Sequence, residues 1–388
     1  MQTKKGNKVN KLALMFISLM LFGISLPSSA WAEYTYTEII PPGWEGASAF
    51  AINNGGDVVG DGWDHDANNH VVEKGFLYSG GNYTEIIPPG WLGAYAYDIN
   101  NSGAIVGSGN VDPISSYEKG FLYSGGNYTE IIPPGWTDAG AYAINNGGDI
   151  VGYGMDANYV AKGFLYSGGN YTEIIPPGWL ARACDINDGG DVVGWGEDAN
   201  YVMKGFLYSG GNYTEIIPPG WYSARLNAIN DGGDILGYGA TYSETMGFLY
   251  SGGNYTEIIP PGWTSASARA INNGGDIVGG GRKEIYMLWR KITLWAKGFL
   301  YSGGNYTDII PPHWEEAYAR AINDNGTIVG SGIDTNDVWK GFIATLQSVC
   351  TTWSDVLAKY QAYKNGQATF GDVIECYIEW REHSPLGQ

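Results

Sequence analysis

The chain has 388 residues, of which 44% are hydrophobic and 14% aromatic, and a formal net charge of −19. A chain this acidic is repelled by nucleic acid and by anionic membrane surfaces, so nucleic acid is excluded as a partner. Three cysteines are too few for a disulfide-rich scaffold, and a hydrophobic core therefore has to supply the stability.

Residues 1–32 have the pattern of a secretory signal peptide. Four lysines precede an apolar run from Leu12 to Leu26, and Ala30-Trp31-Ala32 provides the small-x-small pattern that a signal peptidase cuts. The run is shorter than the roughly 20 residues that span a bilayer. We therefore expect cleavage after Ala32, secretion, and no membrane insertion of the mature chain. Loss of the four lysines would move the net charge from −19 to −23.

The chain between residue 33 and residue 347 consists of near-identical units. The phrase KGFLYSGGNYTEIIPPGW starts at Lys119 and returns, barely altered, at Lys162, Lys204 and Lys297, and AINNGGDIVG recurs between the copies. Units of about 43 residues, made of short apolar runs and Gly-rich turns, are typical of β-propeller blades. In each unit the Asn-Asn-Gly-Gly and Ser-Gly-Gly-Asn turns each join two apolar runs. This pattern predicts two hairpins, and so four strands, per blade.

The counts of these phrases predict how the ring closes. The phrase INxxG occurs seven times, starting at Ile52, Ile99, Ile144, Ile186, Ile229, Ile271 and Ile322. The strand YTEII also occurs seven times, but its first copy, residues 36–40, precedes the first unit, and the last unit lacks one. We therefore predict an all-β, seven-bladed β-propeller whose N-terminal strand completes the last blade and so protects the sheet edges.

The repeated order of Ala-Ile-Asn, Gly-x-Val-Gly and a Gly-Phe-Leu strand resembles the HAF-repeat family of extracellular, propeller-like proteins. The resemblance covers nearly all of residues 34–346. This chain has Lys-Gly-Phe, as at Lys162-Gly163-Phe164, where the name of that family records His-Ala-Phe. The resemblance implies a secreted propeller-like array and does not imply a particular biochemical role.

Variation between the units predicts where a ligand binds. Both hairpin turns share one face of a propeller and hardly change, whereas the PPGW link and the loop between the second and third strands share the other face and do change. A ring of tryptophans on this variable face would offer stacking surfaces to sugars. The seven link tryptophans are Trp44, Trp91, Trp136, Trp179, Trp221, Trp263 and Trp314. In the alternative interpretation each of them wedges between neighbouring blades, since packing would require one in every copy.

The sixth unit carries an insertion, residues 282–295, in which basic and aromatic residues are mixed. Trp289 and Arg290 are its candidate ligand-binding residues, as parts of an aromatic, basic finger over the variable face. The alternative is a tolerated loop insertion without a function.

The sequence predicts no catalytic residues, no metal site and no cofactor. Pairs such as Asp156 and Asn158 place oxygen atoms two residues apart, as calcium loops do, but the Gly and the distal Glu of an EF-hand are missing. The four histidines have no metal-ligand spacing. Repeated carboxylates such as Glu130 and Glu173 would have the same surroundings in every blade, whereas acid–base catalysis needs groups in different environments.

Residues 348–388 have the pattern of helices instead of strands. Two apolar stripes with helical spacing, opened by Thr352-x-x-Asp355 and Thr369-x-x-Asp372, predict a small C-terminal helical hairpin. It is somewhat similar to the paired helices of dockerin modules, without their calcium-ligand loops. The hairpin either packs on the propeller or docks a partner. A disulfide between Cys350 and Cys376, with Cys184 left reduced, is a hypothesis that export would permit.

These observations favour a secreted, non-catalytic binding or surface-interaction protein. Its candidate activity is multivalent carbohydrate binding on the variable face, where linked weak sites gain avidity, and its candidate partner is an extracellular glycan or a surface protein. Two alternatives stay open. A propeller enzyme would act on polysaccharide as a lyase or glycosidase, and a structural extracellular repeat protein would have no small ligand.

Overall fold

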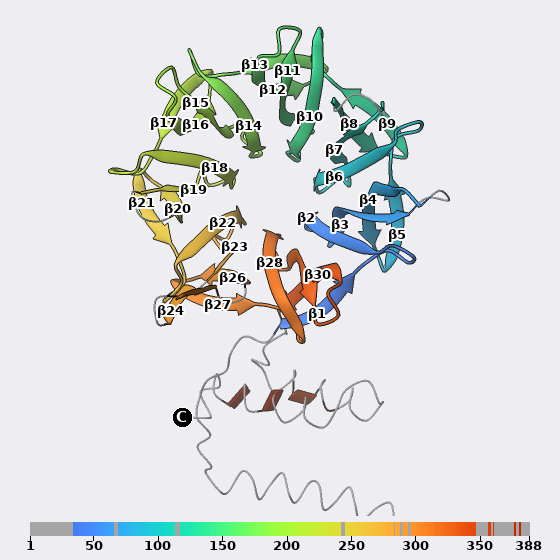
Figure 1. Cartoon of the computed structure of the whole chain (residues 1–388), viewed down its shortest axis with the longest axis vertical. Coiled ribbons are helices and arrows are strands. Elements are labelled where there is room, and N and C mark those ends of the chain that lie inside the picture. Colours follow the sequence, from blue (N-terminus) through green and yellow to red (C-terminus); the bar gives the residue numbers. More distant parts are fainter. Residues whose placement is uncertain are drawn as a thin grey trace, which may run out of the picture. The chain divides into compact units, whose positions relative to one another are not determined.

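In the computed structural model, residues 34–346 form a seven-bladed β-propeller of four-stranded antiparallel sheets around a central axis (Figure 1). The structure describes residues 34–65, 69–112, 117–241, 245–282, 284–287, 290–293 and 296–346, and residues 356, 357, 360, 376, 377, 380 and 381. The predicted signal peptide lies outside these residues. In the described part of the chain, no helix has the length and apolar character needed to cross a membrane.

The first four blades are each made of four consecutive strands. Blade one comprises β2 (Gly46–Ile52), β3 (Val58–His65), β4 (Val71–Ser79) and β5 (Asn82–Ile86); blade two β6 (Gly93–Ile99), β7 (Ile105–Asn110), β8 (Glu118–Ser124) and β9 (Asn127–Ile131); blade three β10 (Trp136–Ile144), β11 (Ile150–Asp156), β12 (Ala161–Ser167) and β13 (Asn170–Ile174); blade four β14 (Leu180–Ile186), β15 (Val192–Glu197), β16 (Met203–Ser209) and β17 (Asn212–Ile216).

The last three blades include the insertion and the closure. Blade five comprises β18 (Ser223–Ile229), β19 (Ile235–Ala240), β20 (Thr245–Ser251) and β21 (Asn254–Ile258); blade six β22 (Ser265–Ile271), β23 (Ile277–Arg282), β26 (Lys297–Ser302) and β27 (Asn305–Ile309); blade seven β28 (Trp314–Ile322), β29 (Ile328–Asp334), β30 (Trp339–Leu346) and β1 (Tyr34–Ile39). Strands β24 (Glu284–Met287) and β25 (Arg290–Thr293) pair only with each other.

The N-terminal strand closes the ring, as the sequence predicted. Strand β1 runs antiparallel to β30, from the pair Tyr34–Leu346 to the pair Ile39–Gly341. Strand β30 would otherwise be an edge with unpaired backbone groups. The outermost strand of blade seven therefore comes from the opposite end of the chain from its three partners.

Glycines permit both the tight turns and the close approach of blades. In blade three, Gly168 and Gly169 have φ angles of +55° and +86°. They form the two-residue turn whose twist matches that of the strands it joins. A Cβ atom on Gly163 would lie 2.7 Å from the carbonyl oxygen of Ile174 and 2.8 Å from the backbone nitrogen of Ala183 in the next blade. A side chain at this position would therefore push two blades apart.

Each junction between blades has its own hydrophobic cluster. Between blades three and four, Val151 and Ile174 meet Ala181, Ala183 and Phe206, and all five side chains are at most 1% exposed. Full burial of one large apolar side chain contributes roughly 1.5–3 kcal/mol. Because equivalent residues recur at the other junctions, the ring is stabilised by repeated copies of one packing arrangement.

The tail belongs to a different unit from the propeller. Most of the predicted helical hairpin lies outside the described residues, and those of its residues that are described have helical backbone. Val356 and Cys376 are buried together against Tyr377 and Trp380. Cys376 is disulfide-bonded, whereas its predicted partner, Cys350, lies outside the described residues. Cys184 is free.

Candidate functional site

The link tryptophans are packed into the blades. Each ring meets, edge-on, the phenylalanine on the third strand of its own blade, at centroid distances of 5.6–6.4 Å. Trp314 is only 7% exposed, and the other six are partly buried in the junction clusters. This geometry is what the packing alternative predicts. Ligand stacking on the exposed part of these rings stays a prediction.

The insertion of the sixth unit contains the two-stranded hairpin β24–β25. Arg290 is the first residue of β25, and only its backbone is described. Trp289 lies outside the described residues. The aromatic, basic finger therefore stays a prediction about a segment whose backbone pairing alone is known.

In six of the seven blades the repeated outer carboxylate is a partner of the repeated lysine, and blade five has Met246 at the lysine position. In blade three, Lys162 Nζ lies 2.8 Å from Glu173 and 3.2 Å from Asp156. Asp156 Oδ1 also accepts the backbone N–H groups of Asn158 and Val160. The loop that resembled a calcium site is thus a turn held by a lysine. In the described part of the chain, no group of three or more His, Cys, Asp or Glu side chains is arranged to hold a metal ion.

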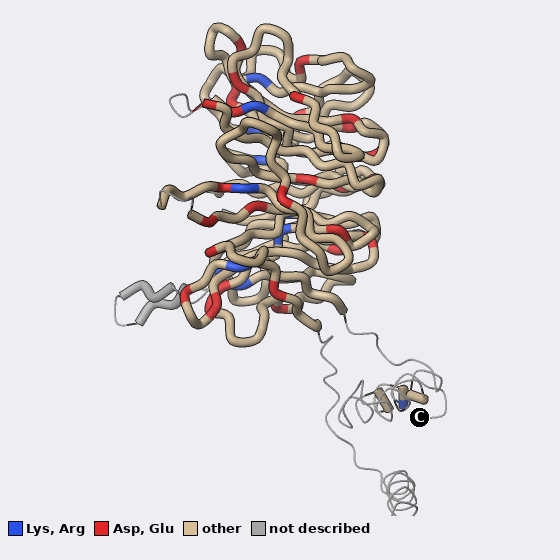
Figure 2. Tube along the Cα trace, turned by 90° about the vertical axis from the view of Figure 1, so that its right-hand side faces the viewer, with Lys and Arg blue, Asp and Glu red and all other residues tan. Residues whose placement is uncertain are grey.

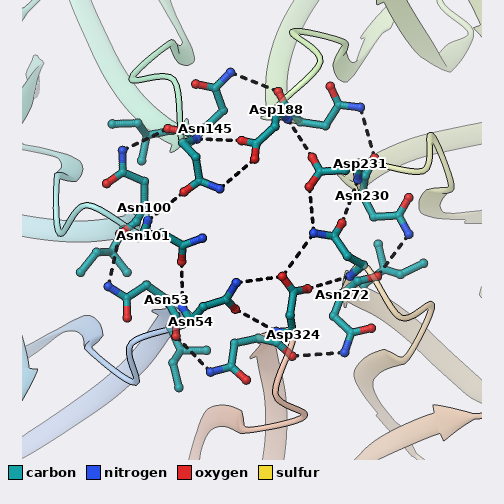
Figure 3. A pocket seen from close by; sticks show the side chains of 18 of the residues that line it. Asn53, Asn54, Asn100, Asn101, Asn145, Asp188, Asn230, Asp231, Asn272 and Asp324 are labelled. Carbon is teal, nitrogen blue, oxygen red and sulfur yellow. Dashed lines mark hydrogen bonds between the residues drawn. The ribbon is translucent and has the colours of Figure 1, made fainter.

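At one mouth of the axis, the seven Asn-Asn or Asn-Asp turns surround a hollow of about 170 Å³ (Figure 3). The first asparagine of each turn is buried, and its Nδ2 donates to the backbone carbonyl of the corresponding asparagine in the next blade, at 3.0–3.2 Å. The cycle starts at Asn53 and ends where Asn323 donates back to Asn53. Each Oδ1 accepts a backbone N–H four residues on, as Asn145 does from Asp149 at 2.8 Å.

The second residue of each turn forms an exposed second cycle. Its Oδ1 accepts the backbone N–H of the equivalent residue in the preceding blade, at 2.8–3.0 Å. Three of these seven residues are acidic, and Asp188, Asp231 and Asp324 each accept an asparagine Nδ2 at 2.8–2.9 Å. We call the two cycles together the axial polar ring. Most of its polar atoms form hydrogen bonds with one another, and these bonds connect neighbouring blades on the turn face.

From the sequence, these asparagines are predicted only as turn residues, and the ring is not predicted. The available signal was an asparagine at the first turn position of all seven units, including the units in which the second position is aspartate. A turn needs only a residue that tolerates its backbone angles. The recurrence of one amide in every copy is what a hydrogen-bonded cycle requires.

Two positions on each innermost strand differ from blade to blade. They lie two and four residues before the isoleucine that ends the strand, about 7 and 13 Å along the strand from that isoleucine. The alternating residues, such as Ala181 and Ala183, pack in the junction clusters, so side chains at the variable positions point away from that packing. The position nearer the ring holds Phe50, Tyr97, Tyr142, Cys184, Asn227, Arg269 and Arg320; the farther one holds Ser48, Tyr95, Gly140, Arg182, Arg225, Ser267 and Tyr318.

The aromatic residues at these positions stack from blade to blade. The ring of Phe50 lies 6.1 Å from that of Tyr97, and Tyr97 stacks on Tyr142 at 5.0 Å. Tyr142 stacks in turn on Tyr153 of β11 at 4.7 Å, with ring planes 6° apart. Behind Phe50, the guanidinium carbon of Arg320 lies 5.0 Å from the Phe50 ring centre. Blades seven, one, two and three are thereby joined by side-chain contacts on their inner strands.

Arginines continue the series through blades four and five. The guanidinium carbon of Arg182 lies 4.2 Å from the centre of the Tyr153 ring and 5.0 Å from that of Trp195 on β15. Arg225 lies 4.6 Å from the same Trp195 ring and 6.0 Å from Tyr238 on β19. We call these nine residues, from Arg320 through Phe50 to Tyr238, the axial belt. One half of it is aromatic and the other half mixes arginine with aromatic rings.

The belt side of the axis also contains a carboxyl group with a perturbed pKa. Burial, together with repulsion from Glu73, raises the pKa of Asp61 to about 7, although Arg320 opposes the rise. Burial, with repulsion from Arg269, lowers the pKa of Arg320 to about 10. The outer carboxylates of six blades therefore share a lysine partner, whereas Asp61, which is not one of these repeated carboxylates, has different surroundings.

No family model and no curated protein matches the chain. Among solved structures, it is similar to the β-propeller domain of the Trilobed protease from Pyrococcus furiosus, with 10% identity, coverage of 77% of this chain and 95% of that one, and a TM-score of 0.56. It is also similar to the acylaminoacyl peptidase of Pyrococcus horikoshii, with 10% identity, 76% and 51% coverage, and a TM-score of 0.50. The chain spans about half the length of that peptidase.

A lectin from Aleuria aurantia in complex with a fucosylated sugar is 12% identical over 71% of this chain and 100% of the lectin, with a TM-score of 0.39, which is too low to support an argument. Together the comparisons establish the propeller fold alone. The Pyrococcus furiosus domain is described as having an open velcro topology, whereas here β1 and β30 close the last blade.

Proposed function

We propose that this protein is a secreted, non-catalytic binding protein that holds a glycan on the axis of the propeller, against the axial belt. The observation that supports the proposal is the belt itself. Its side chains come from strands of six different blades and contact one another in series. Arginine and aromatic residues are the ones that contribute most to binding where they cluster.

The scaffold suits such a role because it is pre-organised. The closing strand β1, the seven junction clusters and the two hydrogen-bonded cycles of the axial polar ring connect every blade to its neighbours. A ligand that binds a surface already held in place loses less free energy to ordering of the protein. Inner-strand side chains are positioned more firmly than side chains on loops, which favours the axis over the variable loops.

Substitution of two tryptophans of blade four distinguishes binding on the axis from binding on the variable face. Residues 33–388 would be screened on a glycan array, and the dissociation constant for the best glycan measured by calorimetry. Trp195→Ala, in the belt, should weaken binding at least about tenfold. Trp179→Ala, the link tryptophan of the same blade, should change it by less than about threefold, because Trp179 packs against Phe206. Both variants would be melted first to establish that they fold.

The opposite result would assign the ligand to the variable face. If Trp195→Ala bound normally and each link tryptophan weakened binding in small, similar steps, the multivalent interpretation would replace ours. If no glycan bound the wild-type protein, the proposed function would be wrong.

A propeller enzyme of the lyase or glycosidase type is the second candidate, favoured by Asp61. A carboxyl group with a pKa near 7 can act as a general acid or base at neutral pH, and Glu73 is close enough to raise that pKa. Release of reducing ends from polysaccharide by the wild-type protein, and its loss in Asp61→Asn, would establish catalysis and end the non-catalytic proposal.

A further inference from the structure

The arginines of the inner strands differ from the lysines in their pairing. All six lysines whose side chains are described form ion pairs with carboxylates within 4.0 Å. Arg182, Arg225, Arg269 and Arg320 form no such pair with any described residue. In a chain with 40 acidic and 21 basic residues, four arginines on consecutive blades thus lack a directly paired carboxylate among the described residues, although Arg320 interacts at longer range with Asp61.

Figure 2 shows that lysine and arginine occupy a narrow band across the blades, whereas aspartate and glutamate are spread widely over them. The four arginines belong to β14, β18, β22 and β28, which surround the axis on adjacent blades (Figure 1). Arg269 and Arg320 occupy the same position in neighbouring blades, and Arg269 helps to lower the pKa of Arg320. The fold therefore contains a local repulsion between these two guanidinium groups, which a bound anion would relieve.

The arrangement also leaves guanidinium N–H groups available. A guanidinium carries five N–H donors in its plane. Arg225 donates to Tyr238 Oη at 3.3 Å and Arg320 to Ser331 Oγ at 2.9 Å, while Arg182 and Arg269 donate no hydrogen bond to a described residue. Arg182 lies over the rings of Tyr153 and Trp195, and Arg225 lies over that of Trp195. A guanidinium stacked on an aromatic ring keeps its N–H donors at the edge of its plane. Such edges fit carboxylate or sulfate groups, two N–H bonds to one anion.

We infer that the axial ligand is an acidic oligosaccharide, whose carboxylate or sulfate groups bind the inner-strand arginines while its sugar rings lie against the aromatic half of the axial belt. This inference rests on the proposed axial binding and adds the charge class of the ligand. The aromatic half, with Phe50, Tyr97 and Tyr142, favours a ligand that presents sugar faces over a small inorganic anion.

The test compares ligands that differ only in charge. Binding of oligogalacturonate and of its methyl ester would be measured by calorimetry at about 50 and about 300 mM NaCl, with a sulfated galactan oligosaccharide to separate sulfate from carboxylate. We expect an acidic sugar to bind at least about tenfold more tightly than the neutral ester, and the difference to shrink at high salt.

Three variants assign the effect to the arginines. Arg182→Gln should weaken binding of the acidic sugar about tenfold or more. Arg182→Lys should restore only part of the affinity, because lysine keeps the positive charge but not the planar pair of N–H donors that matches a carboxylate. Lys119→Gln is the matched control: it removes one positive charge that is already paired with Glu130, and binding should not change. Melting curves would show that all three variants fold.

Two results would overturn the inference while leaving axial binding intact. One is equal binding of the acid and its ester that Trp195→Ala still abolishes, which would mean a neutral glycan. The other is equal loss in Arg182→Gln and Lys119→Gln, which would mean that only overall charge matters. Tighter binding of poly-glutamate than of any acidic sugar would also overturn it. Absence of binding to any glycan would instead contradict the proposed function itself.

Discussion

Removal of strand β1 tests how the ring is held closed. Ile39 is fully buried in the junction of blades seven and one, and loss of such a side chain costs roughly 2–5 kcal/mol. The edge-on contact of Tyr36 with Phe342 at 6.1 Å adds about 0.5–1.5 kcal/mol. The pair of Lys340 with Glu38 at 2.9 Å is half-exposed and adds less than about 1 kcal/mol. Deletion of residues 33–40 should therefore destabilise the propeller by roughly 3–7 kcal/mol.

For a domain of this size, that loss corresponds to a fall in Tm of about 5–10 °C. Differential scanning calorimetry measures the fall, and light scattering after gel filtration measures association through the freed edge of β30. Ile39→Ala and Ile131→Ala form a matched pair, because both isoleucines end the same strand motif opposite a glycine and both are fully buried. Ile131 lies on a strand that a hairpin joins to its blade. Only Ile39→Ala should increase proteolysis at the N-terminus.

The closure argument would be refuted if the truncated protein melted within about 1 °C of the wild type and stayed monomeric. Equal proteolysis of the two alanine variants would show that β1 is held no more loosely than a hairpin strand. An unchanged Tm would mean that the six-residue pairing of β1 with β30 contributes little to the free energy of unfolding.

Three further predictions follow from buried polar groups and cysteines. Asn145→Ala should destabilise the protein by about 1–3 kcal/mol in urea unfolding, because Asp149 N–H and the Asn187 carbonyl lose partners, while the exposed Asn158→Ala should have little effect. Burial raises the pKa of Asp185 to about 7, so the folded state binds more protons between about pH 4 and 7. The free energy of unfolding of the protein should therefore fall as pH rises through that window, by on the order of 1 kcal/mol or more. The fall should be smaller in Asp185→Asn. The same dependence of unfolding free energy on pH in both proteins would contradict this. Thiol titration of the denatured, unreduced mature chain should find one free thiol, Cys184, and three would exclude the disulfide.

The fold could be predicted from the sequence because near-identical units repeat the same pattern of strands and glycine-rich turns. Glycines with positive φ, such as Gly168 and Gly169, and the orphan strand before the first unit follow from backbone sterics and from counting. The turn glycines depend only on neighbouring residues, and the orphan strand is found by counting the copies of each repeated phrase. Both can therefore be read from the sequence alone. The same reasoning predicted that β1 completes the last blade, which the pairing of Ile39 with Gly341 confirms.

The axis could not be predicted, because the residues that meet there are separated by whole blades in the sequence. Arg320 and Phe50 lie at opposite ends of the propeller sequence and touch only after the ring closes. The amide of Asn323 reaches the carbonyl of Asn53 for the same reason. Within one unit, Arg182 is a single basic residue between two alanines. Its contacts with Tyr153 and Trp195, and the absence of a paired carboxylate among the described residues, arise because closure brings the variable inner strands of separate blades together around one axis.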